Sequence, residues 1–147
     1  MVADKNHKVP KKTVLFLCTG NSCRSQLAEA IVSEKLGDSW LALSAGTKPA
    51  GYVHPLAEQV LEEIGINHQG KSKNASKFKG QEFDLVVTVC DSASQDCPAW
   101  LSGNPQVHLA FEDPAGFQGD QQSKLDKFRQ VRDEIAEKIP GLLARYE

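Results

Sequence analysis

A strand pattern that runs directly into a cysteine-containing loop, and from there into a helical pattern, sets the strongest limit on the fold of this chain. Residues 14–17 are four consecutive apolar residues, as in a strand that is covered on both faces. Gly20 allows a tight turn in the loop that follows. Apolar residues then recur at helical spacing between Leu27 and Leu36, and Gly37 ends the pattern. This order predicts a strand, a loop and a helix, with the loop at the carboxyl end of the strand.

The rest of the chain alternates strands and helices in the same way. Residues 40–44, 85–89 and 106–109 are expected to form three further strands, of which the last is short. Helical patterns cover residues 55–65, where proline stands first and glycine last, and residues 125–139. Strands that alternate with helices imply a parallel α/β sheet with right-handed crossovers.

The segments between these elements are expected to be mostly irregular. Residues 47–54, 91–105 and 116–122 are expected to be loops, because they are rich in turn-forming or small polar residues. Residues 69–82 are expected to hold a short helical turn at most. The Pro-Gly pair at residues 140–141 should break or kink the final helix near its end.

Composition favours one domain and excludes several classes of protein. A chain of 147 residues with 40% hydrophobic residues can bury one core but is short for two domains. A net charge of −2 indicates neither nucleic-acid nor membrane-surface binding, and no apolar run reaches the roughly 18 residues of a membrane span. Residues 1–12 are basic and lack the apolar region of a signal peptide. We therefore expect a flexible basic tail, one domain over residues 13–147 and a cytoplasmic location.

Four cysteines in a chain without an export signal are candidates for function. In the reducing cytosol, cysteines serve in transient catalytic disulfides or in metal binding more often than in permanent bridges. Cys18 and Cys90 each follow the end of a predicted strand. Ligands of parallel α/β sheets bind outside the carboxyl ends of the strands, so we expect these two cysteines at one edge and close enough to meet.

Cys18 and Arg24 flank a loop that is suited to attack on a tetrahedral oxyanion. Amide groups at a helix N-terminus and a neighbouring guanidinium favour the thiolate form of a cysteine, which is the nucleophile. The same amides, with Arg24 closing the ring, can hold a phosphate-like anion against the sulfur. Alternatively, Cys18 only ends a buried strand and Arg24 is a solvated helix residue.

The loop of residues 18–26, Cys-Thr-Gly-Asn-Ser-Cys-Arg-Ser-Gln, resembles the phosphate-binding loop of the low-molecular-weight protein tyrosine phosphatase superfamily. Within that superfamily it is most similar to the thioredoxin-coupled arsenate reductases. The resemblance extends over residues 13–139 and implies a four-stranded, flavodoxin-like sandwich of three α/β/α layers. Further motifs in the family's order are Ser44-Ala45-Gly46, residues 84–90, Cys97-Pro98, residues 112–115 and residues 131–135.

The resemblance supports a relay of three cysteines. Reduction of arsenate to arsenite takes two electrons, so a second thiol, Cys90, must attack Cys18 while arsenic leaves with the electron pair. Cys97 then attacks Cys90 by thiol–disulfide exchange. The resulting Cys90–Cys97 disulfide would be reduced by thioredoxin, with glutaredoxin and glutathione as the alternative. Two other interpretations stay open: inert buried thiols, or a structural zinc site of Cys18, Cys23, Cys90 and Cys97, for which the Cys90–Cys97 spacing is long.

The resemblance also assigns roles to residues around Cys18. Asp113 would protonate the leaving oxygen as a general acid, although an Asp-Pro pair can simply begin a turn. Ser25 would hydrogen-bond the Cys18 sulfur, or only start the helix, and Asn21 would order the loop. Cys23 has no required chemical step and is assigned to packing. The oxyanion would be bound by Thr19, Gly20, Asn21, Ser22, Cys23, Arg24 and Ser25.

Two departures from the family's pattern bear on the ligands. Ala115 follows the Asp-Pro pair where the phosphatases usually carry Tyr, which weakens the phosphotyrosine interpretation. Some related reductases bind potassium through residues that match Asn21, Glu29 and Ser44, but an Asp of that site aligns with the neutral Asn74. A bound potassium ion is therefore only a weak expectation, and no tightly bound cofactor is expected. The histidines match no metal-ligand spacing and are expected to be surface or turn residues: His7, His54, His68 and His108.

These observations together predict a monomeric arsenate reductase that serves arsenic detoxification. Phosphate and sulfate would mimic arsenate in its loop, and the shared loop chemistry predicts a weak phosphatase activity. Two alternatives stay open. One is a low-molecular-weight phosphatase that uses Cys18, Arg24 and Asp113 alone, and the other is a noncatalytic module that binds an oxyanion or zinc.

Overall fold

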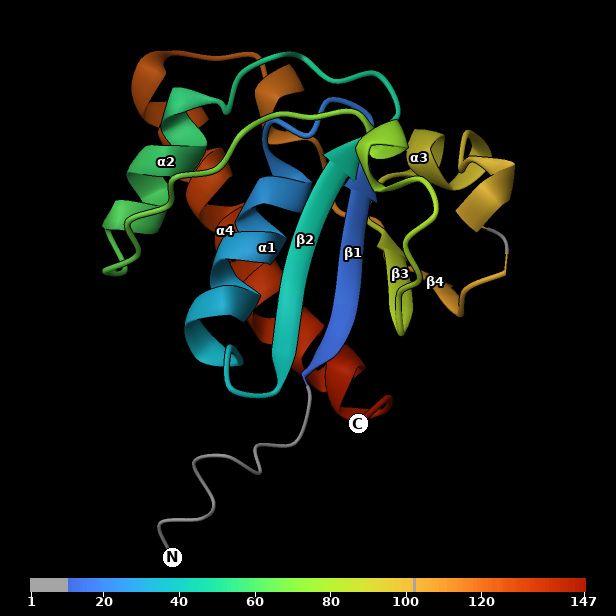
Figure 1. The fold of residues 1–147 in the computed structure, drawn as a ribbon. Helices are drawn as coiled ribbons and strands as arrows, with labels where there is room; N and C mark the ends of the chain where they lie inside the picture. The colour runs from blue at the N-terminus through green and yellow to red at the C-terminus, as the bar shows by residue number, and fades with distance from the viewer. Residues whose placement is uncertain (1–10, 102) are drawn as a thin grey trace, which may run out of the picture.

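Four parallel strands form the centre of the protein, in the order β2-β1-β3-β4. The computed structural model describes residues 11–101 and 103–147, so the expectation for the first ten residues, His7 included, lies outside the described part (Figure 1). The strands are β1 Lys12–Cys18, β2 Trp40–Gly46, β3 Leu85–Thr88 and β4 Gln106–His108. The predicted parallel four-stranded sheet is thereby confirmed.

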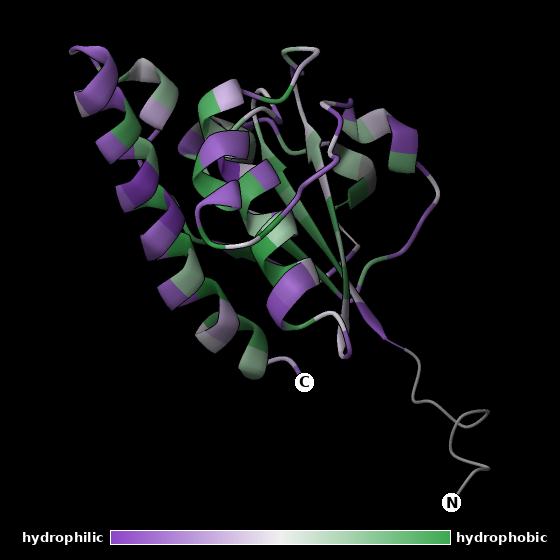
Figure 2. Ribbon diagram, turned by 90° about the vertical axis from the view of Figure 1, so that its left-hand side faces the viewer, coloured by the Kyte–Doolittle hydropathy of each residue, from purple (hydrophilic) through white to green (hydrophobic). Residues whose placement is uncertain are grey.

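Helices cover both sides of this sheet, as the three-layer prediction requires (Figures 1 and 2). The helices are α1 Arg24–Lys35, α2 Pro55–Glu62, α3 Asp91–Gln95 and α4 Gln121–Ala144, with short 3-10 turns η2 Ala75–Phe78, η3 Ala99–Leu101 and η4 Pro114–Gly116. α1, α2 and α4 contact one another, whereas α3 contacts β1 and β3. Within the described residues, no helix is long and apolar enough to cross a membrane.

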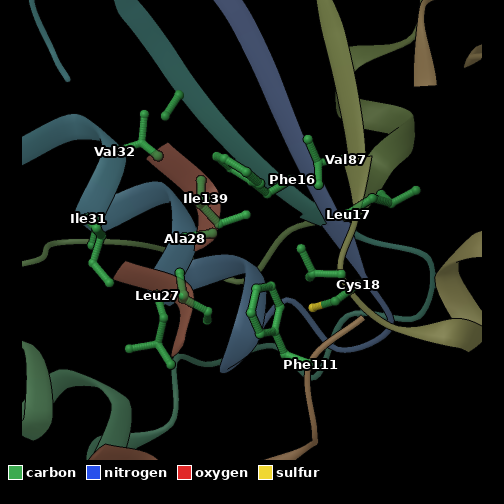
Figure 3. Close-up of a cluster of buried hydrophobic side chains, with 14 of the residues drawn as sticks. Phe16, Leu17, Cys18, Leu27, Ala28, Ile31, Val32, Val87, Phe111 and Ile139 are labelled. Atoms are coloured by element: carbon green, nitrogen blue, oxygen red, sulfur yellow. The ribbon is translucent and has the colours of Figure 1, made fainter. Parts of the chain in front are cut away.

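The core is built around β1, which lies between β2 and β3 and is buried from Val14 to Cys18. Because successive side chains of a strand point to opposite faces, Phe16 packs toward α1 and α4 while Leu17 points to the other side (Figure 3). Ile139 of α4 lies in the same cluster as Phe16. Burial on both faces fixes the position of β1 and therefore the position of the loop that begins at its end.

The segment of residues 91–105 is more ordered than the predicted loop, because it contains α3 and η3. Contacts with the sheet explain the difference. Ala93 is buried, and its backbone N–H lies 3.4 Å from the Cys90 sulfur. Asp91 Oδ1 lies 2.8 Å from Nε2 of His108 on β4. Tertiary contacts of this kind stabilise a helix that is too short to form alone, and a periodicity analysis does not detect them.

The final helix also differs from its prediction at both ends. It begins at Gln121, because the Asp120 side chain accepts a hydrogen bond of 2.8 Å from the backbone N–H of Ser123, so the preceding loop is shorter than expected. The sequence predicts a break or a kink at residues 140–141, and a break is wrong, because α4 continues through Pro140 to Ala144. A proline removes one helical hydrogen bond, and burial of Leu142 and Leu143 offsets that loss.

The position of Phe16 in the core predicts a large effect of truncation. Phe16→Ala should lower the free energy of unfolding by about 3–5 kcal/mol, because it removes a fully buried ring between the sheet and two helices. Urea denaturation measures this change. Leu41→Ala on β2 is the control, because Leu41 is 46% exposed and should lose far less. Equal losses in the two variants would contradict the packing described here.

Candidate active site

The carboxyl ends of β1 and β3 bring two cysteines to one edge of the sheet, as the sequence predicts. Cys18 ends β1, and Cys90 follows β3 at a distance of two residues. The hydroxyl of Thr19 lies 3.5 Å from the Cys90 sulfur, so Cys90 is a neighbour of the loop. All four cysteines are free thiols. Cys97 is half-buried and lies 3.9 Å from Oε1 of Gln106 on β4.

The backbone carbonyls of the loop are bonded to the neighbouring segment of residues 47–54. The amide groups in the first turn of α1 lack helical partners, so they are available to bind an anion. The donor and acceptor pairs are Thr47 to Cys18, Lys48 to Thr19, Ala50 to Gly20 and His54 to Ser22, with N···O distances of 2.9–3.1 Å. The segment of residues 47–54 is thus a loop, as predicted, and it shapes the anion cradle.

Hydrogen bonds hold the Cys18 sulfur at the base of this cradle. The backbone N–H of Asn21 donates to the sulfur at 3.2 Å, and Ser25 Oγ lies 2.8 Å from it. Ser25 Oγ also accepts a bond of 2.9 Å from Asn21 Nδ2, so the one hydrogen of this hydroxyl is free to point at the sulfur. Asn21 adopts the left-handed conformation, with φ of 48°, that this geometry needs. These contacts fix the position of the sulfur at the base of the loop.

Arg24 and Asp113 lie on the open side of the loop. The Arg24 guanidinium donates a hydrogen bond of 3.1 Å to the carbonyl oxygen of Phe111, and its other terminal nitrogen lies 3.7 Å from an Asp113 oxygen. Asp113 also accepts a bond of 3.0 Å from the backbone N–H of Ala115, which is the turn contact that an Asp-Pro pair makes. The Asp113 side chain is half exposed, so it stands at the mouth of the site.

These groups line a pocket of about 190 Å³ at the loop. Two neighbours of the cradle, Tyr52 and His54, were not assigned to the site from the sequence. Of the predicted anion-binding residues, Asn21 and Ser25 are fully buried behind the sulfur, and the Thr19 hydroxyl faces Cys90. The pocket is lined by Cys18, Gly20, Ser22, Cys23, Arg24, Ala50, Tyr52, His54, Asp113 and Ala115.

His54 is a turn residue, as expected for the histidines, and it also forms part of the pocket wall. Its Nδ1 accepts a hydrogen bond of 3.1 Å from the backbone N–H of Leu56 at the start of α2, and its ring packs 4.7 Å from that of Phe128. Burial lowers the pKa of His54, and the Asp113 carboxylate opposes this fall. His54 is therefore neutral near pH 7 and acts as a cap for the helix.

The other thiols separate into different environments. Burial raises the pKa of the Cys23 thiol to about 12, so Cys23 stays protonated and inert, in agreement with a packing role. Burial also raises the pKa of the Cys97 thiol. Within residues 11–101 and 103–147, no three histidine, cysteine or acidic side chains come together as a metal site. This geometry gives no support to the structural zinc interpretation.

The three residues matched to a potassium site do come together, behind the loop. Ser44 Oγ accepts a hydrogen bond of 3.0 Å from Asn21 Nδ2 and donates one of 2.6 Å to Glu29 Oε1. The ammonium group of Lys73 lies against the same residues, which the sequence gave no reason to expect. Burial lowers the pKa of this ammonium, and the Glu29 carboxylate opposes the fall. The Asn74 side chain instead accepts a bond of 2.9 Å from the backbone N–H of Ser76.

Comparisons with known proteins agree on one family. Residues 13–147 match the sequence profile of the low molecular weight phosphotyrosine protein phosphatases. A protein of Halalkalibacterium halodurans named arsenate reductase is 45% identical over 130 residues, which cover 88% of this chain and 93% of that protein. A solved structure described as an arsenate reductase in the oxidized state has a TM-score of 0.77 at 28% identity, and covers 92% of this chain and 99% of the other. A low molecular weight protein tyrosine phosphatase from T. tengcongensis has a TM-score of 0.74 at 27% identity, with the same coverage.

A close approach between Gly46 and the loop leads to a prediction about oxyanion binding. A Cβ at Gly46 would lie 2.5 Å from the carbonyl oxygen of Thr19, so Gly46→Ala should displace the loop backbone. We expect the variant to bind inorganic phosphate at least about tenfold more weakly, which corresponds to about 1.4 kcal/mol, in titration calorimetry. Gly141→Ala is the control, because its Cβ would meet no atom within 4 Å. Unchanged phosphate affinity of Gly46→Ala would contradict the described contact.

Proposed function

Because the chain belongs to the low molecular weight phosphotyrosine protein phosphatase family, we propose that Cys18 attacks a tetrahedral oxyanion and that this oxyanion is arsenate. The proposed activity is the reduction of arsenate to arsenite, as in the relatives that carry the name arsenate reductase. The observation that carries this choice over a phosphatase is the free Cys90 thiol beside the loop, 3.5 Å from the Thr19 hydroxyl. A phosphatase has no chemical use for a second thiol at this place.

The first step uses the loop, Arg24 and Asp113. The Cys18 thiolate attacks arsenic, while the loop amides and the guanidinium hold the arsenate oxygens and their negative charge. A sulfur–arsenic bond forms, and one arsenic–oxygen bond breaks. Asp113, which lies at the mouth of the pocket beside Arg24, donates the proton that lets this oxygen leave as water. Arsenic is still in its oxidised state at this point.

The second step supplies the two electrons. The Cys90 thiolate attacks the Cys18 sulfur, a disulfide forms between them, and the sulfur–arsenic bond breaks with its electron pair left on arsenic. Arsenite is the product. Cys97 then attacks the Cys90 sulfur, which releases Cys18 as a thiolate and leaves a Cys90–Cys97 disulfide. Reduced thioredoxin would return both thiols by donating two electrons, with glutaredoxin and glutathione as the alternative donor.

We expect α3 to rearrange when the Cys90–Cys97 bond forms. A five-residue helix such as α3 is about 7.5 Å long, and it lies between the two cysteines. The Cα atoms of a disulfide are at most about 7 Å apart. A helix this short has little stability of its own, and the His108–Asp91 contact that holds it is largely exposed. The segment is therefore suited to rearrange during the relay.

Two further features complete the proposal. The protein is proposed to act as a monomer in the cytoplasm, in line with the composition of its sequence. A weak phosphatase activity is the second candidate function, because Cys18, Arg24 and Asp113 are also the groups that phosphate transfer needs. Tyr52 supplies an aromatic ring on one side of the pocket, but Ala115 supplies none on its side, which disfavours phosphotyrosine as the main substrate.

The relay is tested by trapping its intermediate. Cys97→Ser should release about one arsenite per enzyme and then stop as the Cys18–Cys90 disulfide, whereas Cys90→Ser should release none. Arsenite is counted after mixing with arsenate, and peptide mapping by mass spectrometry identifies the disulfide. Cys23→Ser is the control and should turn over repeatedly, because the buried Cys23 thiol has no step in the relay.

Multiple turnovers by Cys97→Ser with thioredoxin as the sole donor would contradict the last step of the relay. The donor itself is identified by comparing arsenite formation with thioredoxin and its reductase against formation with glutathione and glutaredoxin. If the wild-type protein forms no arsenite with either donor but hydrolyses phosphate esters, the phosphatase alternative is correct.

The proposed role of Asp113 predicts a slow chemical step in its neutral variant. Asp113→Asn should reduce the rate of arsenite formation in a single turnover by about 100-fold, the usual contribution of a general acid. Rapid-quench measurement counts the arsenite formed, so it does not depend on the rate of product release. Glu112→Gln is the matched control, because its carboxylate pairs with Lys127 outside the pocket and should leave the rate unchanged. Equal rates in Asp113→Asn and the wild type would limit Asp113 to its turn contact.

A further inference from the structure

A lysine ammonium lies where the aligned residues would hold a potassium ion. The Nζ of Lys73 is 3.5 Å from Asn21 Oδ1, 3.4 Å from Ser44 Oγ and 3.8 Å from Glu29 Oε1. These are the three residues matched to the cation site. A fourth oxygen, the Lys71 carbonyl, lies 2.9 Å from the same nitrogen. The ammonium and the Glu29 carboxylate are both mostly buried, at 17% and 19% side-chain exposure.

A potassium ion does not fit this cluster together with Lys73. An ammonium has three N–H donors and no acceptor, and three oxygens other than the carboxylate surround it here. Its single positive charge balances Glu29, so a second cation would meet repulsion rather than attraction. The Asn74 side chain also does not point to the site, because it caps the turn at Ser76. The geometry and the charge of the site are therefore already complete.

We propose that the Lys73 ammonium serves as a built-in monovalent cation that positions Asn21, and through it the Cys18 sulfur. Lys73 donates to Asn21 Oδ1 twice, from its backbone N–H at 2.9 Å and from its ammonium. The amide nitrogen of Asn21 is thereby turned toward Ser25, whose hydroxyl contacts the sulfur. Each donor polarises the next in such a chain, so a positive charge at its start strengthens the bond at its end.

Lys73 is thus a positioning residue, and its effect on the sulfur passes through Asn21 and Ser25. The inference concerns the loop itself and does not require arsenate as the substrate. It implies that the protein needs no added potassium, and that loss of the ammonium opens a cation site made of Asn21, Glu29 and Ser44 oxygens. A monovalent cation in solution should then replace the missing charge.

Two substitutions of Lys73 separate charge from packing. Lys73→Ala removes the charge and leaves room for an ion, whereas Lys73→Met removes the charge but fills the room. The thermal unfolding midpoint and the rate of Cys18 alkylation by iodoacetamide are measured in potassium chloride and in choline chloride at equal ionic strength. Lys79→Ala is the control, because this lysine is exposed and nearby in the sequence.

In choline chloride, both Lys73 variants should unfold about 5 °C below the wild type, with severalfold slower alkylation of Cys18. Potassium chloride should restore Lys73→Ala in both measurements and leave Lys73→Met unchanged. The wild type and Lys79→Ala should be the same in the two salts. Titration calorimetry with potassium chloride should detect binding to Lys73→Ala and none to the wild type.

Three results would overturn the proposal. The first concerns the wild-type protein and does not depend on the folding of any variant: it binds potassium, or its thermal stability or its rate of Cys18 alkylation is higher in potassium chloride than in choline chloride. The second is alkylation of Cys18 at the wild-type rate in both Lys73 variants in choline chloride. Rescue of Lys73→Ala and Lys73→Met to the same extent would also overturn it, because salt would then act without occupying the site.

Discussion

The position of the Cys18 sulfur is the constraint on which the rest of the structure depends. A sulfur at the end of a buried strand is removed from water, so its hydrogen-bond donors must be supplied by the protein. The backbone N–H of Asn21 and the Ser25 hydroxyl supply them. Their placement depends on the left-handed conformation of Asn21 and on hydrogen bonds to both the oxygen and the nitrogen of its side-chain amide. The central position of β1, the glycine at the end of β2 and the carbonyl pairing with residues 47–54 all maintain that loop geometry.

Most of the fold and the reactive centre could be predicted from the sequence, because both follow from local patterns. Apolar periodicity located the four strands and the main helices, and strand ends located Cys18 and Cys90. Contacts between distant segments could not be predicted in this way. Lys73 lies beside Asn21, and His54 lies in the pocket wall. Both residues belong to irregular segments, whose paths cannot be predicted from the spacing of apolar residues. The continuation of α4 past Pro140 likewise depends on burial of Leu143, a tertiary effect.

The same loop can serve hydrolysis or reduction, and the surroundings decide between them. Arg24 and Asp113 lie 3.7 Å apart, which is too long for a strong hydrogen bond, so both remain available to an anion that enters the pocket. For hydrolysis, water completes the reaction. For reduction, the Cys90 thiol must approach the Cys18 sulfur. This approach requires that the segment around α3 can move while the loop after β1 keeps its shape. α3 is only five residues long and depends on its contacts with β1 and β3, so it can rearrange when those contacts are lost.

A tethered ammonium and a dissolved cation differ in how they order this loop. An external ion stabilises its site only in proportion to its concentration relative to its dissociation constant. Lys73 is attached to the chain next to the site, so its local concentration is fixed by covalent structure. The cost is that the lysine side chain loses rotamer freedom and its hydration. Three uncharged oxygens and the Glu29 carboxylate offset this cost only if all keep their places, so the residues behind the sulfur should also be sensitive to substitution.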